Sequence, residues 1–161
     1  MIFTKGHHMT ETADHGWLYQ RIVEDSPIAI LFADREGKIR FWNSSAEAMF
    51  GYGAEEALGQ SLDLIVPDRQ RARHWEGWAS VMASGVTKYG RDALAVPALR
   101  KDGSRISIEF NIVLLRAPAG ELLGAAAMVQ DVTARWQKQK EMNARLAALE
   151  GKAAEAPRGG A

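Results

Sequence analysis

The feature that most constrains the fold is the alternation of apolar and polar side chains over residues 105–114. A period of two predicts a β-strand with one face on a core and the other in water, which antiparallel sheets allow. The side chains expected on the core face are Ile106, Ile108, Phe110, Ile112 and Leu114. Residues 122–132 predict a second strand after the turn at 117–120, rich in small side chains.

Three further strands are expected. Residues 27–33 and 38–42 flank a turn at 34–37 that contains a glycine, which indicates a hairpin. In its second strand Ile39 and Phe41 should face opposite to Arg40 and Trp42. Residues 88–99 form a moderately strand-like stretch, in which Pro97 favours an edge or a bulge.

Helical spacing appears between and around these strands. Residues 16–24 predict a short amphipathic helix, and residues 44–47 resemble a capping box that starts a series of single helical turns. The longest helix of the body is expected over 68–84, where Trp75, Trp78, Ala79 and Met82 lie on one side. Thr133 is expected to cap a last helix that Gly151 ends.

The chain therefore predicts an α+β domain, in which short helices and one longer helix cover one face of a five-stranded antiparallel sheet. We expect a disordered leader over 1–14, the domain over 15–133, an exit helix over 134–151 and a disordered tail over 152–161. Met9 is an alternative start to Met1.

Composition excludes several classes of protein. Twenty basic and twenty acidic residues give no net charge, which argues against a nucleic-acid partner. The absence of cysteine excludes disulfides, thiolate metal sites and a cysteinyl–flavin adduct. Apolar runs stay far below the ~18 residues of a membrane span, so we expect a cytoplasmic protein without membrane contact. No paired carboxylates, phosphate loop or GxSxG motif is visible, and we expect no enzymatic activity.

Five short motifs, in order, resemble the PAS family of sensory domains over about residues 17–135. They are the hairpin 28–43, the stretch 42–52 (WNSSAEAMFGY), 55–60 (EEALGQ), 100–104 (RKDGS) and 131–133 (DVT). The resemblance implies the fold described above, and it implies that residues 131–133 join the domain to downstream elements.

A finer resemblance is to the haem-binding oxygen sensors of the FixL type within that family. Residues 74–78 (HWEGW), 82–85 (MASG) and 100–104 follow the spacing of those sensors without a gap. His74 therefore occupies the position of the axial ligand of haem b, and neutral imidazole is a natural ligand of haem iron. The candidate cofactor-binding residues are His74, Trp78, Tyr89, Leu94, Phe110, Ile112 and Ala127, with His74 as the metal ligand.

The chain departs from those sensors on the ligand side of the haem. Leu94 stands where they place an arginine that hydrogen-bonds oxygen, and Asp92 stands where a related sensor places methionine. A haem pocket that is apolar on the side where the gas binds favours CO or NO over strongly held O₂, because no polar group stabilises the bound oxygen. The small residues 124–127 are expected to leave room for a macrocycle, and Arg71, Arg73 and Lys88 are candidate partners of its propionates.

Plainer interpretations remain open beside the haem site. His74 could simply pack at the helix edge, the tryptophans could be core residues, and Asn43 could satisfy backbone groups where the strand turns into the helix. The sequence thus predicts a sensory module that detects a gas or redox state, or a cofactor-free interaction module or small-metabolite binder. In both cases we expect a homodimer, associated through the exit helix, and a separate signalling partner in a regulatory pathway such as the control of transcription.

Overall fold

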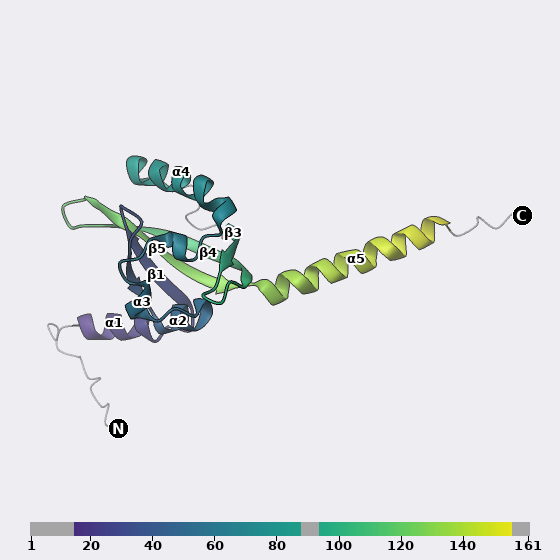
Figure 1. Ribbon diagram of the computed structural model, residues 1–161, viewed down its shortest axis with the longest axis horizontal. Coiled ribbons are helices and arrows are strands. Elements are labelled where there is room, and N and C mark those ends of the chain that lie inside the picture. The colour runs from purple at the N-terminus through teal and green to yellow at the C-terminus, as the bar shows by residue number, and fades with distance from the viewer. Residues whose placement is uncertain (1–14, 88–93, 156–161) are drawn as a thin grey trace, which may run out of the picture.

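Antiparallel strands form a single five-stranded sheet in the computed structural model, which describes residues 15–87 and 94–155 (Figure 1). The strands are β1 (Ala29–Asp34), β2 (Ile39–Trp42), β3 (Leu94–Leu99), β4 (Arg105–Arg116) and β5 (Leu122–Asp131). Their order is β2-β1-β5-β4-β3, which makes β3 with its Pro97 an edge strand, as predicted. The predicted α+β fold class is confirmed. The part of the third strand expected over 88–93 lies outside the described residues.

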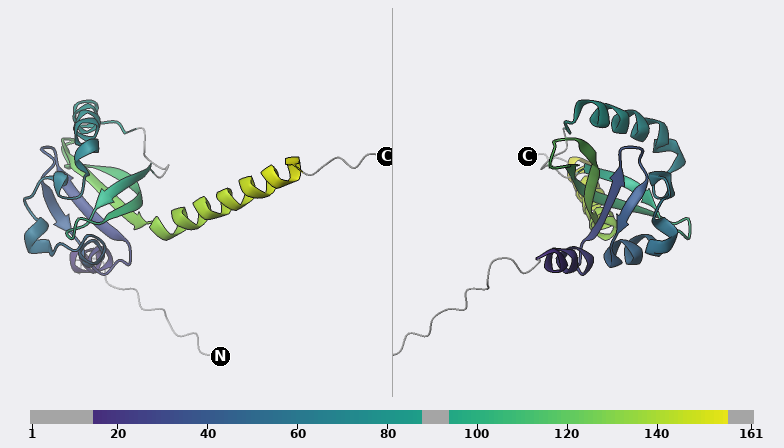
Figure 2. Two further views of the ribbon diagram at one scale, coloured as in Figure 1. Left: turned by 45° about the vertical axis from the view of Figure 1, so that its right-hand side comes forward. Right: turned by 90° about the vertical axis from the view of Figure 1, so that its left-hand side faces the viewer.

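Helices precede, cover and follow this sheet. They are α1 (Gly16–Glu24), α2 (Ser44–Phe50), α3 (Ala54–Ala57), the 3₁₀ turn η1 (Leu62–Leu64), α4 (Asp68–Ser84) and α5 (Thr133–Glu155). The bounds of α1 and α4 are those predicted from helical spacing. In Figures 1 and 2, α4 lies along one side of the sheet and α5 projects away from the domain.

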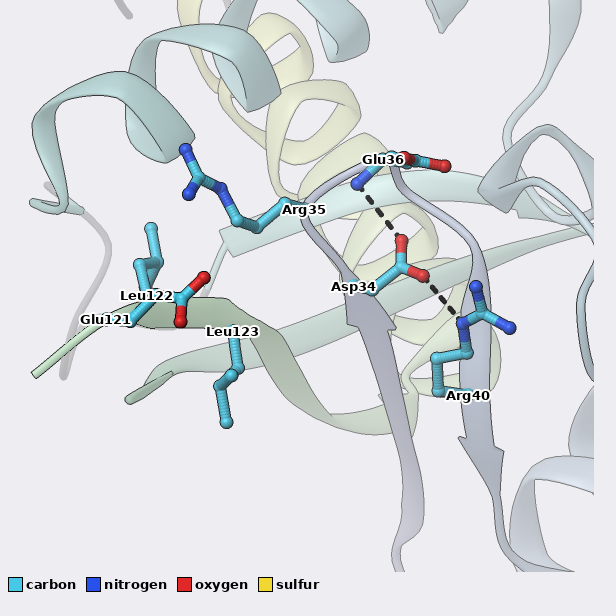
Figure 3. A pocket seen from close by; sticks show the side chains of 7 residues that line it. All are labelled: Asp34, Arg35, Glu36, Arg40, Glu121, Leu122 and Leu123. Atoms are coloured by element: carbon cyan, nitrogen blue, oxygen red, sulfur yellow. Dashed lines mark hydrogen bonds and ion pairs between the residues drawn. The ribbon is translucent and has the colours of Figure 1, made fainter. Parts of the chain in front are cut away.

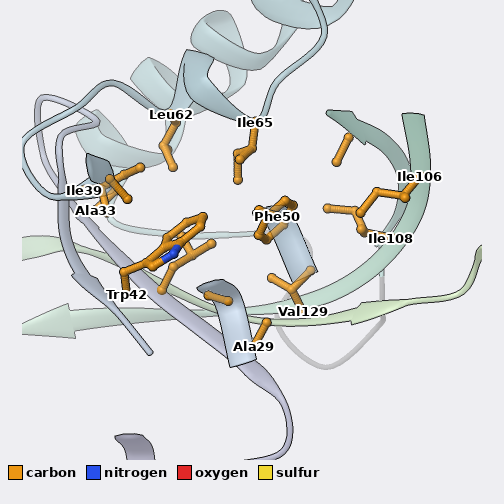
Figure 4. Packing of buried hydrophobic residues seen from close by; sticks show 14 residues of the cluster. Ala29, Ala33, Ile39, Trp42, Phe50, Leu62, Ile65, Ile106, Ile108 and Val129 are labelled. Atoms are coloured by element: carbon orange, nitrogen blue, oxygen red, sulfur yellow. The ribbon is translucent and has the colours of Figure 1, made fainter. Parts of the chain in front are cut away.

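The core lies between the sheet and the helices that follow β2. Cross-strand pairs align the inner side chains in rows, such as Ile112 with Ala127 and Ala127 with Leu31. Leu31 is opposite Trp42, which packs 5.3 Å from the ring of Phe50 on α2, measured between centroids (Figure 4). The buried set of this cluster is Ala29, Leu31, Ala33, Ile39, Trp42, Ala46, Phe50, Ala57, Leu62, Ile65, Ala98, Ile106, Ile108 and Val129.

The faces of β2 differ from the predicted alternation. Ile39 and Trp42 are both buried, although they were expected on opposite faces. The register explains this, because Ala33 pairs with Ile39 while the preceding Phe32 pairs with Phe41, which leaves Arg40 as an extra residue. A β-bulge of this kind turns one strand and moves the following side chains to the other face.

Asn43, rather than the serine after it, caps α2. Its Oδ1 accepts hydrogen bonds from the backbone N–H of Ala46 at 2.9 Å and of Ile30 at 2.9 Å. Its Nδ2 donates to the carbonyls of Val23 and Ile28, each at 3.0 Å. The capping box expected over 44–47 is therefore wrong, and the expectation that Asn43 satisfies backbone groups at this corner is confirmed. The side chain joins α1, β1 and α2.

α5 runs further than the sequence indicated. It continues through Gly151 to Glu155, whereas the exit helix was expected to end at 151. Glycine inside a helix costs about 1 kcal/mol relative to alanine, and the good helix formers at 152–155 offset that cost. The part of the expected tail over 156–161 and the leader over 1–14 lie outside the described residues.

The points where the chain enters and leaves the sheet are neighbours. The start of β1 pairs with the end of β5, with Ala29 opposite Val129. Beyond β5, Val132 is buried and its N–H donates to the carbonyl of Ser107 at 2.8 Å. α1 and α5 therefore connect to adjacent positions of the neighbouring strands β1 and β5.

Candidate functional site beneath α4

His74 lies on the side of α4 that faces the core. Its ring is 4.8 Å from that of Trp75 and stacks 6.1 Å from that of Trp78, measured between centroids. Its Nδ1 is buried, and within the described residues it has no hydrogen-bond partner. The imidazole is thus held among aromatic side chains with one polar atom unused.

The surroundings of His74 favour its neutral form. Burial lowers the pKa of the imidazole below its usual value, because desolvation penalises the charged form, while the carboxylate of Asp63 opposes this effect. Lowering the pKa leaves the ring neutral near pH 7, and neutral imidazole is the form that coordinates a metal ion.

α4 is attached to the domain through its tryptophans and its ends. The indole N–H of Trp75 donates to Oδ1 of Asp63 at 2.8 Å, and that of Trp78 donates to the carbonyl of Arg35 at 3.0 Å. Gly37, at φ 74°, lies under Trp75, where an added Cβ would be 2.3 Å from the indole ring. At the other end of the helix, Arg116 donates to the carbonyl of Gly85 at 2.9 Å. The helix therefore rests on the β1–β2 turn and on the end of β4.

The structure brings several of the predicted cofactor-binding residues into one region. Trp78, Phe110 and Ala127 pack against the main core cluster, and Ile112 packs with Trp78 against the smaller cluster of Met82, Leu122 and Ala125. Trp75 and Trp78 pack against the core, which confirms the interpretation of these tryptophans as core residues, and their rings also contact His74.

Two predicted residues receive less support. Leu94 is placed by its backbone opposite Phe110 on β4, and its side chain is not described. Tyr89, together with the propionate candidate Lys88, lies outside the described residues. Of the remaining propionate candidates, Arg71 already donates to the carbonyls of Asp63 and Val66.

Gly124 does not provide the room that was expected for a macrocycle. A Cβ at this position would lie 2.0 Å from the carbonyl oxygen of Ala33, and the backbone has φ 153°. The glycine is needed because β1 approaches β5 closely there. This part of the prediction is corrected: the missing side chain at Gly124 is accounted for by strand packing.

Two surface hollows are described, and His74 lines neither. One, of about 230 Å³, lies between Asp34, Arg35 and Arg40 on one side and residues 121–123 on the other (Figure 3). The second, of about 610 Å³, is bordered by residues 48–51 and 100–102. Neither hollow therefore provides an opening to the side chain of His74.

Asp34 organises the turn that supports α4. Its carboxylate accepts hydrogen bonds from Nε of Arg40 at 2.6 Å and from the N–H groups of Glu36 and Lys38, each at 3.0 Å (Figure 3). Burial alone would raise the pKa of Asp34, but these hydrogen bonds outweigh it and hold the pKa below its usual value of 3.8.

We predict that Asp34→Ala lowers the free energy of unfolding by about 1–2 kcal/mol at pH 6, because it removes all three hydrogen bonds. Because the pKa of Asp34 is lower in the folded than in the unfolded protein, its carboxylate stabilises the folded state at pH values above the unfolded pKa. This stabilisation is lost as the pH falls through the folded pKa. The difference from wild type should therefore shrink by pH 2.5 in urea unfolding. Glu141→Gln on the exposed part of α5 is the control, with no change expected at either pH. An equal difference at both pH values would contradict the assignment.

A second network joins the core to α5 through residues of three motifs quoted from the sequence, 42–52, 100–104 and 131–133. Arg100 donates to the carbonyl of Met49 on α2 at 2.9 Å and to Oδ2 of Asp131 at 2.7 Å. Oδ1 of Asp131 accepts from the N–H of Thr133 at 2.9 Å and from its hydroxyl at 2.6 Å. The first turn of α5 is thus connected through Asp131 to α2 and to the β3–β4 turn.

Gln70 is a residue near His74 that no sequence pattern singles out. It lies one turn before His74 on α4, and its Oε1 is also buried without a partner among the described residues. The spacing of four residues could have drawn attention to it, but no sequence pattern shows that a surface-type amide is turned inward. Within the described residues, no cluster of three potential metal-ligating side chains occurs.

Comparison with known proteins agrees with this architecture. The chain is 33% identical over 118 residues to an uncharacterized protein of Azorhizobium caulinodans and 25% identical over 124 residues to the oxygen sensor protein DosP of Escherichia coli. The two matches cover 72% and 77% of this chain, but the chain spans only 16% and 15% of the length of the two relatives. The sensor protein FixL of Bradyrhizobium diazoefficiens is 34% identical over 53 residues, which are 33% of this chain and 10% of that protein.

Solved structures and a family model point to the same fold. The PAS domain of a protein from Colwellia psychrerythraea superposes with a TM-score of 0.65 at 24% identity, over 75% of this chain and 99% of that one. No helix among the described residues is long and apolar enough to cross a membrane. The family model of the PAS fold matches residues 18–132, and the chain belongs to the PAS family.

Proposed function

We propose that this PAS domain is a sensory module that binds haem b through His74 and passes the state of the iron to a separate signalling protein. The observation that carries the proposal is the position of the His74 imidazole against the rings of Trp75 and Trp78, with a buried Nδ1 that has no partner among the described residues. The similarity to DosP, which is named as an oxygen sensor, supports it. We propose a cytoplasmic setting and no catalysis by the module itself.

The residues around His74 suit an apolar macrocycle in chemistry. Trp78, Phe110, Ile112 and Ala127 are apolar, and all belong to the clusters beneath α4. When bound, haem supplies an iron that takes diatomic gases or changes its redox state. The chain would supply the axial imidazole and exclude water. Leu94 offers no hydrogen-bond donor, so CO and NO are the gases that the proposal favours.

Uptake of hemin tests the proposal directly. Protein purified without haem and titrated with hemin should develop a Soret band at one equivalent, and protein expressed with a haem precursor should be coloured. A colourless protein that takes up no hemin would overturn the haem assignment. A yellow protein with flavin bands would replace haem by a flavin as the bound group.

The proposed output runs through α5. Arg100, Asp131 and Thr133 connect α2 and the sheet to the first turn of this helix, so a change beneath α4 that moves the sheet also bears on the helix. Further along, Met142, Leu146 and Leu149 are 49–64% exposed and follow a spacing of four and three residues. This is the spacing of the apolar seam of a coiled coil.

We predict that the domain dimerises through this seam. Sedimentation should detect a concentration-dependent dimer, and Leu146→Glu should weaken it by at least about tenfold, because each buried leucine contributes roughly 1.5–3 kcal/mol. Lys140→Glu, on the other side of the helix, is the matched control and should leave association nearly unchanged. A wild type that stays monomeric at high concentration would remove this part of the proposal.

A cofactor-free interaction module is the second candidate. His74 lines neither of the two described hollows, which favours this candidate, and so do the apolar side chains that α1 exposes to solvent. Trp17, Tyr19 and Ile22 are each at least 60% exposed. The hemin titration separates the two candidates, because this one expects no uptake. A small apolar metabolite is a further ligand that such a module could take.

A further inference from the structure

Two unused polar atoms lie one helical turn apart on the inner side of α4. Among the described residues, the buried side-chain N and O atoms without a hydrogen-bond partner are Oε1 of Gln70, Nδ1 of His74 and Oγ of Ser104. Ser104 belongs to the distant β3–β4 turn, whereas Gln70 and His74 are at positions i and i+4 of one helix. Side chains with this spacing are neighbours on the helix surface.

Several other polar groups of this region already have partners. Oδ1 of Asp63 accepts from the indole of Trp75, and the indole of Trp78 donates to the carbonyl of Arg35. Arg71 donates to the carbonyls of Asp63 and Val66 and forms an ion pair with Asp68 at 2.9 Å. Among the described residues, Oε1 of Gln70 and Nδ1 of His74 are the buried side-chain N and O atoms of α4 without a partner.

The two unused atoms are chemically complementary. An amide oxygen only accepts hydrogen bonds, and a neutral imidazole donates from whichever ring nitrogen carries the proton. A buried polar atom without a partner loses the free energy of its bond to water, so a small rotation that joins two such atoms is favourable. Because the two residues are at positions i and i+4, a rotation of the Gln70 side chain can carry its oxygen toward the imidazole.

We propose that Gln70 is the positioning residue of His74: its Oε1 accepts a hydrogen bond from Nδ1–H and so fixes the tautomer in which Nε2 carries the free electron pair. The hydrogen bond made by one ring nitrogen decides which atom of a histidine is left to bind a metal. The tautomer assignment stands on the Gln70–His74 pair alone. Its consequence for the iron rests on the proposed function.

The tautomer is measured on the protein without haem. Long-range ¹H–¹⁵N NMR at neutral pH should show His74 as the Nδ1–H form in wild type and in Gln70→Glu, which keeps an acceptor. Gln70→Leu should convert it to the Nε2–H form. Arg69→Leu, an exposed neighbour on α4, is the control and should leave His74 unchanged. A wild-type His74 in the Nε2–H form, or a Gln70→Leu variant that keeps Nδ1–H, would overturn the proposal.

Haem binding separates this inference from the proposed function. Gln70→Leu should weaken hemin affinity by about 10–100-fold, the usual cost of losing the partner of a ligating histidine. Gln70→Glu should restore the affinity and make the reduction potential of the iron more negative, because a carboxylate makes the imidazole a stronger donor. If wild type takes up no hemin, the proposed function fails, and the NMR experiment still decides the role of Gln70. If hemin binds equally to wild type and Gln70→Leu, the function stands and the positioning role is wrong.

Discussion

Replacing His74 by alanine should abolish the Soret band of the protein titrated with hemin. In the proposed site the imidazole would hold the iron, so removing it should cost more than the 10–100-fold in affinity that the loss of a supporting partner costs. The affinity for hemin should therefore fall by more than about a hundredfold. Absorbance and fluorescence titrations measure this change, because five tryptophans report quenching by haem.

Two comparisons make the result specific to His74. His15→Ala removes an exposed histidine just before α1 and should leave the hemin titration as in wild type. Adding free imidazole to the His74→Ala protein should restore part of the band, because the small molecule can occupy the space left by the side chain. A His74→Ala protein that binds hemin as tightly as wild type would show that the iron is held elsewhere or only adsorbed.

Replacing Asn43 by alanine should lower the free energy of unfolding by about 3–4 kcal/mol. The side chain is 2% exposed and makes four hydrogen bonds to backbone groups of α1, β1 and α2. Loss of a helix cap costs about 1 kcal/mol, and each backbone group left buried without a partner adds roughly 1–3 kcal/mol, part of which water entering the site recovers. The effect is large because one amide serves three elements.

Urea unfolding followed by circular dichroism measures this loss. Asn43→Asp keeps the two acceptor interactions of Oδ1 and loses the donors to Val23 and Ile28, so its stability should lie between those of wild type and Asn43→Ala. Asn143→Ala on exposed α5 is the matched control, with an expected change below about 0.5 kcal/mol. A loss under 1 kcal/mol for Asn43→Ala would show that water or neighbouring groups replace its hydrogen bonds.

The parts of the fold that the sequence predicts well are those in which one period dominates. The alternation through Ile106 and Ile108 places the core face of β4, and the spacing of Trp75 and Trp78 gives the bounds of α4. Local patterns are less informative where tertiary contacts determine which side chains are buried. The bulge at Arg40 moves Trp42 into the core, and nothing in the local sequence requires it.

In the candidate site, too, some residues can be predicted from the sequence and others depend on tertiary contacts. Resemblance to known sensors singles out His74, which the structure places partly buried on α4. Gln70 could not be found in this way, because an amide on a helix is usually solvated and its burial depends on the tertiary packing of α4. The prediction that Gly124 leaves room for a macrocycle is wrong for a related reason. The close approach of β1 to β5, which fills this space, is a property of the sheet rather than of either strand.

The pairing of Ala29 with Val129 has a mechanical consequence. Because the first residue of β1 lies opposite the end of β5, tension applied through α1 and α5 would load the backbone hydrogen bonds between these strands one pair at a time. Bonds loaded in succession separate at a lower force than bonds sheared together. A pull on the two flanking helices would therefore open the sheet from this end first, while the strand pairs at the Gly124 end would remain closed until last.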